Sequence, residues 1–268
     1  MELIQYIFLG IVQGFTEFLP ISSSGHLIIL KYFMDIPQNI ILDITLHLGT
    51  LIAVLIYYKN SVFMILKDLF NDAKNKKLNF KSYSKNSYLS FYIIFATIPA
   101  AILGASFDSF FESLRSLLLV SVMLVAVSIY MLYDHYKTKN RKNFSKLNFK
   151  NTFLIGLSQV LALIPGTSRS GMTITTGSLL GLSKKQAADF TFLLSIPIIL
   201  GAFVYKLKDV TSFSFFMSLD VIVSFVASFI AGYFSIGFLL GVLKKYGLIP
   251  FVIYRILLAV ILLFFLNF

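Results

Sequence analysis

Long apolar runs dominate this chain and constrain its fold more than any other feature. An α-helix needs roughly 20 such residues to cross the hydrocarbon of a bilayer, at about 1.5 Å per residue. Hydrophobic residues make up 57% of the 268 and charged residues only 13%, which is too little polar surface to cover a soluble domain. The runs are rich in Phe and Leu and lack the two-residue alternation of barrel strands. We therefore expect an all-α polytopic membrane protein.

Six segments are long enough to be full crossings: about 40–58, 88–107, 115–134, 187–205, 218–243 and 249–267. Two of the connections between them are strongly basic. Residues 59–85 carry seven lysines, and residues 137–150 carry six basic residues and no acid. Basic loops beside membrane helices tend to lie in the cytoplasm, so the net charge of +11 indicates topology, and we expect no nucleic-acid partner. The short loop 108–114 then faces outside.

The sequence also contains an internal duplication with a spacing of 146 positions. It aligns the cluster Ser22-Ser23-Ser24-Gly25-His26 with a second cluster, Ser168-Arg169-Ser170-Gly171. The same shift superposes Gly10 on Gly156, Gln13 on Gln159, Ile28 on Ile174, Asp43 on Asp189, Thr45 on Thr191 and Leu48 on Leu194. We divide the single membrane domain, 1–268, into repeat 1 (about 1–58), a helical hairpin (88–134), repeat 2 (about 151–205) and C-terminal helices (218–267).

Proline and glycine interrupt an apolar run near its midpoint in each repeat. The breaks contain Pro20 and Gly25 in the first and Pro165, Gly166 and Gly171 in the second. Non-helical backbone at membrane depth is tolerated only where protein or a water-filled cavity satisfies its polar groups. We expect two re-entrant helix-loop-helix hairpins that meet near the middle of the membrane. The alternative is that each is a pair of short, kinked crossings.

The charges predict opposite directions for the two repeats. The crossing 40–58 leads into a basic loop, so it runs from outside to inside, whereas Lys184 and Lys185 precede the crossing 187–205, which then runs outward. Lys206 and Lys208, at the far end of that crossing, argue against this direction. We predict an inverted-topology repeat with a site at the repeat interface.

Glu17 is the first candidate for chemistry, because a carboxylate inside a membrane is costly and therefore suggests function. It follows Gln13 by one helical turn, so the pair could hold a divalent cation or orient a water; alternatively, Glu17 could form a structural hydrogen bond to a neighbouring helix. The hydroxyls and imidazole of the first cluster could supply a nucleophile and a base, or only cap a helix. These residues are Ser22, Ser23, Ser24 and His26.

The second cluster is suited to a phosphoryl group. Free amides at a helix start, hydroxyl donors and a guanidinium fork can bind phosphate together. The side chains concerned are Ser168, Arg169, Ser170 and Thr173. Arg169 needs an anionic partner, either Glu17 across the repeat interface or, as we favour, a substrate phosphate.

Other polar residues have less distinctive settings. Asp43 and Asp189 are equivalent in the repeat and could bind metal or stabilise helix starts. His47 and Arg255 are candidates for buried structural partners. The small residues Ser228, Ala231 and Gly232 could line a helix interface, either in a homodimer or within one subunit.

Two motifs resemble those of the undecaprenyl-diphosphate phosphatase family, the bacitracin-resistance membrane phosphatases. That family has Glu or Gln, three residues, then Glu, followed by a serine-rich stretch ending in Gly-His. The corresponding segment here runs from Gln13-Gly14-Phe15-Thr16-Glu17 through Ser22-Ser23-Ser24-Gly25-His26. The family's later Pro-Gly-x-Ser-Arg-Ser-x-x-Thr motif matches Pro165 through Thr173. Both motifs are complete and in order.

The resemblance implies hydrolysis of undecaprenyl diphosphate to the monophosphate and inorganic phosphate, at the outer face of the bacterial plasma membrane, which recycles the lipid carrier for cell-wall synthesis. It assigns Glu17 to metal binding or acid/base work and Ser23 or His26 to the nucleophile. It also implies that Ser168, Arg169 and Thr173 grip the diphosphate, and that a divalent cation, Mg²⁺ or Ca²⁺, takes part. Gln13 stands where many members have Glu, which weakens any mechanism that needs two carboxylates.

Two alternatives to this enzyme mechanism follow from the same residues. An activated water could attack without a covalent intermediate. A transporter or lipid flippase could use the same inverted repeats and bind a phosphorylated polyprenyl headgroup without cleaving it.

Overall fold

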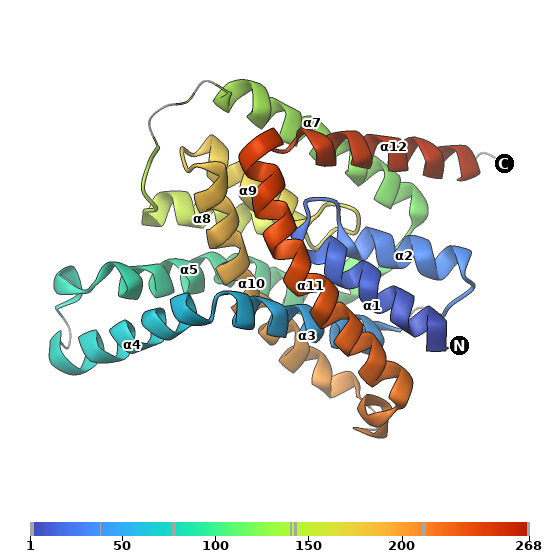
Figure 1. The fold of residues 1–268 in the computed structure, drawn as a ribbon, viewed down its shortest axis with the longest axis horizontal. Coiled ribbons are helices and arrows are strands. Elements are labelled where there is room, and N and C mark those ends of the chain that lie inside the picture. The colour runs from blue at the N-terminus through green and yellow to red at the C-terminus, as the bar shows by residue number, and fades with distance from the viewer. Residues whose placement is uncertain are drawn as a thin grey trace.

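The computed structural model describes residues 3–37, 39–76, 79–139, 141, 144–210 and 213–266, which form helices and no strand (Figure 1). The α-helices are α1 Leu3–Phe18, α2 Ser23–Phe33, α3 Ile40–Tyr57, α4 Lys59–Lys76, α5 Lys85–Ser106, α6 Asp108–Ser113, α7 Leu117–Thr138, α8 Phe149–Leu161, α9 Arg169–Leu179, α10 Lys184–Lys206, α11 Leu219–Tyr246 and α12 Ile249–Leu266. Short 3-10 helices are η1 Phe80–Ser82, η2 Leu207–Asp209 and η3 Phe213–Met217. The predicted domain ends at 1–2 and 267–268 lie outside the described residues.

The prediction of an all-α polytopic membrane protein is confirmed. Within the described residues, α5, α7, α10, α11 and α12 are each long and apolar enough to cross a membrane. The sixth predicted crossing corresponds to α3, which passes the same test only together with α4. The two helices meet at a bend of 77°.

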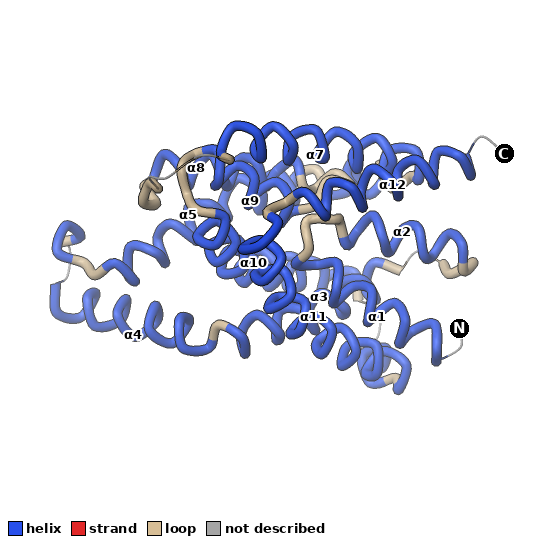
Figure 2. The backbone as a smooth tube through the Cα atoms, turned by 45° about the horizontal axis from the view of Figure 1, so that its top comes forward, coloured by secondary structure: helices blue, strands red, loops and turns tan. Residues whose placement is uncertain are grey.

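Helix α4 differs from the sequence prediction, which treated its residues as part of a basic loop. It runs beside α5 (Figure 2). Asp72 of α4 accepts hydrogen bonds from the Ser84 amide at 2.6 Å and from the Ser87 hydroxyl at 2.7 Å, at the start of α5. These hydrogen bonds hold α4 against α5, whereas the lysines of this segment had suggested only a solvated loop.

The duplicated segments have matching structures. Helices α1, α2 and α3 correspond to α8, α9 and α10, and α2 and α9 begin and end at positions related by the spacing of the repeat. Both breaks reverse the chain. Tyr6 and Leu9 of α1 cluster with Leu30 near the end of α2, and Asn151 at the start of α8 donates to the Leu180 carbonyl after α9. These are helix-loop-helix hairpins rather than kinked crossings.

Ion pairs and hydrogen bonds show that α3 and α10 run in opposite directions. At one end, Asp43 of α3 contacts Arg115, just after α6. Lys206, at the last residue of α10, contacts Asp108 and Glu112 of α6, each at 2.5 Å. At the opposite end, the Tyr58 hydroxyl that follows α3 donates to Asp189 near the start of α10. The charge of Lys206, which had argued against inverted repeats, is therefore neutralised by two acids of α6.

The two repeats interlock with helices from the other half of the chain. Helix α11 packs on α1 and α3, whereas α5 packs on α8 and α10, the corresponding pair. A Cβ built on Gly14 of α1 would lie 2.4 Å from the Ser228 carbonyl, 2.6 Å from the Ala231 Cβ and 2.7 Å from the Gly232 amide of α11. The small residues of α11 thus pack against α1 within the chain.

Candidate active site

The two serine clusters adopt the same unusual backbone conformation at the tips of the hairpins. Ser22 and Ser168 precede α2 and α9 with φ of 76° and 78°, values that non-glycine residues seldom adopt. Each hydroxyl accepts a hydrogen bond from the amide of the glycine three residues later, Gly25 or Gly171, which stabilises the helix start. The duplication therefore preserves a strained turn that presents the next residue at a helix N-terminus.

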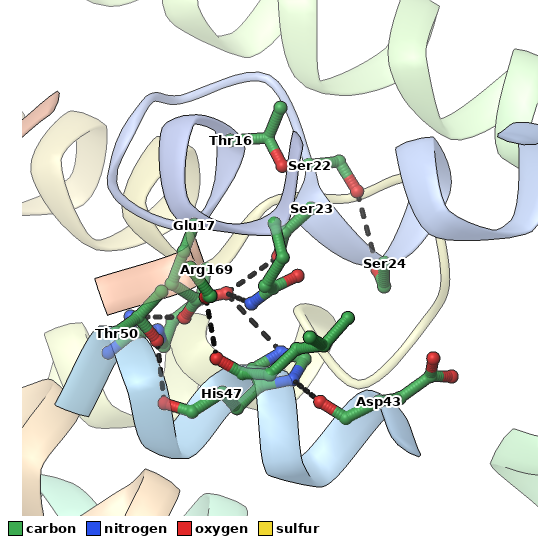
Figure 3. Close-up of polar contacts among 12 residues, drawn as sticks. Thr16, Glu17, Ser22, Ser23, Ser24, Asp43, His47, Thr50 and Arg169 are labelled. Carbon is green, nitrogen blue, oxygen red and sulfur yellow. Dashed lines mark hydrogen bonds and ion pairs between the residues drawn. The ribbon is translucent and has the colours of Figure 1, made fainter. Parts of the chain in front are cut away.

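That next residue is Ser23 in the first repeat and Arg169 in the second, and both reach Glu17 (Figure 3). The Ser23 hydroxyl donates to Glu17 Oε2 at 2.7 Å, and the Arg169 Nη2 donates to Glu17 Oε1 at 2.8 Å. Glu17 itself ends the first helix of its hairpin and is buried. Equivalent positions of the two repeats thus contribute a hydroxyl and a cation to one carboxylate.

Two further side chains surround Glu17. The Gln13 Nε2 donates to Glu17 Oε2 at 3.0 Å, and its own Oε1 is buried without a hydrogen-bond partner in the described structure. His47, from α3, lies with Nε2 at 3.3 Å from Glu17 Oε2 and Nδ1 at 2.6 Å from the Asp43 carbonyl (Figure 3). A carbonyl only accepts, so Nδ1 carries a hydrogen, and the contact with Glu17 requires one proton shared between carboxylate and imidazole.

Glu17 and His47 border a cavity of about 220 Å³, whereas Gln13 is fully buried and does not line it. The serines of the first cluster, Ser168 and Arg169 line it together with Glu17 and His47, and Ile198, Ile199 and Ala202 of α10 form an apolar wall. Arg169 uses one terminal nitrogen on Glu17, whereas Nη1 is buried with no partner among the described residues. The cavity therefore combines hydroxyl donors and a guanidinium with spare hydrogen-bonding capacity, the groups that bind phosphate.

Other residues predicted for the site do not line the cavity. His26 donates from Nδ1 to the Ser22 carbonyl at 2.7 Å, and its Nε2 lies 2.6 Å from the Tyr254 hydroxyl, so both ring nitrogens have partners elsewhere. Thr173 donates to the Arg169 carbonyl at 2.9 Å, one turn earlier in α9. Ser170 donates to the Leu19 carbonyl at 2.9 Å and so joins the two hairpin tips.

Arg255 of α12, which the sequence suggested only as a buried partner, joins both hairpin tips to α7. Its side chain is fully buried and donates to the Pro20 carbonyl at 3.2 Å and to the Gly166 carbonyl at 3.0 Å, one in each tip. It also donates to the carbonyls of Met123 and Leu124 in α7. Its hydrogen-bond acceptors among the described residues are all backbone carbonyls. Arg255 thus fixes Glu17 and Ser23 relative to Arg169.

The acidic residues of the repeat are used elsewhere. Asp43 pairs with Lys31 and Arg115, and Asp189 contacts Tyr58 and Lys185. The described residues contain no group of three or more His, Cys, Asp or Glu side chains that could enclose a metal ion.

A divalent cation shared with a phosphorylated substrate needs fewer protein ligands, commonly one or two carboxylates. Glu17 beside the unpartnered Gln13 Oε1 fits that arrangement.

Comparison with known proteins identifies relatives along the whole chain. The family profile for bacitracin resistance protein BacA matches residues 6–261. Undecaprenyl-diphosphatase 1 of Pseudoalteromonas translucida (strain TAC 125) is 40% identical over 270 residues, which cover 100% of both chains. The undecaprenyl-diphosphatase of Caldicellulosiruptor bescii is 42% identical over 270 residues, which cover 99% of this chain and 98% of the relative. The chain therefore belongs to the bacitracin resistance protein BacA family.

Proposed function

We propose that this protein hydrolyses undecaprenyl diphosphate to undecaprenyl phosphate and inorganic phosphate. The observation that carries the proposal is the convergence of Ser23 and Arg169 on Glu17 inside one cavity. A hydroxyl next to a carboxylate is poised to lose its proton, and a guanidinium beside it can bind the phosphoryl group that is attacked. Family membership and the full-length relatives named undecaprenyl-diphosphatase support the substrate.

In the proposed reaction, the Ser23 hydroxyl attacks the terminal phosphorus of the diphosphate. The Ser23 proton passes to Glu17, the bond from Ser23 oxygen to phosphorus forms, and the bond from phosphorus to the bridging oxygen breaks to release undecaprenyl phosphate. Water then attacks the phosphoserine: the bond from the water oxygen to phosphorus forms, the bond from phosphorus to the Ser23 oxygen breaks to release inorganic phosphate, and Glu17 returns a proton to Ser23 as it takes one from the water. The 2.7 Å hydrogen bond between Ser23 and Glu17 supports this choice of nucleophile, whereas His26 lies with both nitrogens occupied.

Arg169 has two roles in this scheme. Before substrate binds, its guanidinium neutralises Glu17 and so limits the cost of a buried carboxylate. When the diphosphate enters, the guanidinium turns to the phosphoryl oxygens and stabilises the charge that develops there. Glu17 is then freer to accept the serine proton, while His47 and Gln13 keep the carboxylate in position.

A divalent cation, Mg²⁺ or Ca²⁺, would be held at the proposed site by Glu17 and the Gln13 Oε1. It would neutralise the diphosphate and polarise the phosphorus. We further propose that the cavity serves the outer leaflet of the bacterial plasma membrane and that the reaction recycles the lipid carrier for cell-wall synthesis. His47 at the cavity lies one helical turn from Asp43, which contacts Arg115 just after α6, the segment that the charge pattern places outside, and this supports the orientation.

Phosphate release from undecaprenyl diphosphate in detergent with Mg²⁺ or Ca²⁺ tests the function. Ser23→Ala, Glu17→Gln and Arg169→Ala should each lose at least about 100-fold in kcat, as expected for groups that act in proton transfer or charge stabilisation. Ser90→Ala is the matched control, because this buried hydroxyl donates to the Ser87 carbonyl of its own helix, α5. Acid quenching should trap phosphoserine in the wild type. Folded wild-type protein that moves the lipid between leaflets but releases no phosphate would establish a flippase instead.

A further inference from the structure

A second cavity, of about 370 Å³, lies between α5 and α10. It shares two lining residues, Ile198 and Ala202, with the cavity that contains Glu17 and Arg169, so the two cavities lie next to each other. Small side chains line much of the second cavity: Ala100, Ala101, Gly104 and Ala105 of α5, and Gly201 of α10. We call this space the α5/α10 groove.

The helix contact that lines the groove is looser than the contact of α3 with α11 in the other half of the fold. There, α11 closes tightly on α3, and a Cβ built on Gly49 would lie 2.6 Å from the Phe225 carbonyl. In the groove, a Cβ on Gly201 would meet nothing within 4 Å, and one on Gly104 would meet only the Leu163 side chain, at 3.4 Å. The contact between α5 and α10 is therefore looser than that between α3 and α11, and it lies next to the cavity.

The position of the groove suits an apolar chain that enters from the side. Gly201 and Ala101 are exposed, and the neighbouring Ile102 and Val204, each 59% exposed, present an apolar outer surface. Towards α6 the helices are tied together, because the Tyr205 hydroxyl donates to the Ala105 carbonyl at 3.0 Å. The opening thus faces the hydrocarbon beside the helices.

We propose that the α5/α10 groove binds the isoprenoid chain of the substrate next to its diphosphate. This inference rests on the proposed function, since it requires a polyprenyl diphosphate whose headgroup occupies the Glu17 cavity. Burial of successive apolar groups in the groove would hold the reactive end in place, while the remainder of a long chain stays in the bilayer. The volume of the groove, near the lower limit for small-ligand pockets, suits the first part of such a chain.

Substitution of Gly201 by Phe tests the groove, because the new ring has space to enter it. We expect the ratio of kcat/KM for undecaprenyl diphosphate to that for isopentenyl diphosphate, whose single isoprene unit fills little of the groove, to fall at least tenfold, equivalent to about 1.4 kcal/mol. The matched control is Gly241→Phe, at another exposed helical glycine with nothing within 4 Å and outside the groove. An unchanged ratio in Gly201→Phe would overturn the inference.

A labelling experiment avoids dependence on a bulky substitution. The chain has no cysteine, so Gly201→Cys and Gly241→Cys each create a single thiol. Undecaprenyl phosphate should slow labelling of Gly201→Cys by an uncharged thiol reagent at least about fivefold, as expected from coupling of roughly 1 kcal/mol, but not that of Gly241→Cys. Inorganic phosphate should protect neither.

The two experiments distinguish the failure of the groove from the failure of the function. Hydrolysis by the wild type with equal labelling of Gly201→Cys in the presence and absence of undecaprenyl phosphate would refute the groove alone. Absence of phosphate release from either diphosphate would refute the proposed function, and the inference with it.

Discussion

Replacement of Arg255 tests whether one buried guanidinium holds the two halves of the site together. Arg255→Met keeps an unbranched side chain but removes the donors to Pro20 and Gly166 in the hairpin tips and to Met123 and Leu124 in α7. The lost hydrogen bonds, at about 1 kcal/mol net each, suggest a destabilisation of roughly 4 kcal/mol. Relief from burying a charge offsets part of this, so we expect about 2–4 kcal/mol.

The substitution should also affect catalysis, because both hairpin-tip acceptors are close in sequence to the site residues. Pro20 lies between Glu17 and Ser23 in the chain, and Gly166 precedes Arg169 by three residues. A displacement of about 1 Å between reacting groups can cost roughly 100-fold in rate, and we expect a fall in kcat of that order. Arg255→Lys should give little rescue, since one ammonium lacks the planar fork that reaches both tips and α7.

Thermal unfolding in detergent and phosphate release measured well below the unfolding midpoint separate the two effects. Lys244→Met, at an exposed position near the end of α11, serves as the control. The reasoning is refuted if Arg255→Met unfolds at the wild-type temperature and retains the wild-type kcat. Full recovery of kcat in Arg255→Lys would show that charge, rather than the guanidinium geometry, matters.

Three further predictions concern the packing, the carboxylate and the cation. Gly14→Ala should destabilise the fold by about 1–3 kcal/mol, because the added Cβ would press on the Ser228 carbonyl. Gly241→Ala, where the added Cβ lies in open space, should leave the unfolding temperature unchanged. Equal unfolding temperatures for Gly14→Ala and the wild type would contradict the prediction. His47→Leu should lower kcat about tenfold and alter the pH profile of kcat, because the contact with Glu17 is lost. His47→Gln, which keeps a hydrogen-bond donor, should recover much of the rate. Identical pH profiles for His47→Leu and the wild type would exclude a role of His47 in proton sharing. A chelator should abolish phosphate release, and Gln13→Ala should raise the Mg²⁺ or Ca²⁺ concentration that restores half of it; release that is insensitive to chelation would remove the cation from the mechanism.

The structure brings only some of the predicted site residues together around the Glu17 cavity. Both hairpins and their equivalent helix starts could be expected, because the duplication is visible in aligned Ser, Gly and Pro residues. The contact between Arg169 and Glu17 was one of two options left open, and the structure has it. The place of His26 against Tyr254 could not be foreseen, since a short separation in sequence does not determine which way a side chain points from a helix.

The sequence by itself determined the helical membrane class, five of the six predicted crossings and the duplicated turns. These follow from local properties, since the transfer of an apolar segment into hydrocarbon and the backbone freedom of Gly and Pro depend on residues close in the chain. Only the tertiary structure placed His47 on Glu17, Arg255 across both tips, and an open groove between α5 and α10. These features depend on how helices distant in sequence approach and rotate against one another, and small side chains at those contacts decide whether the helices close or leave space.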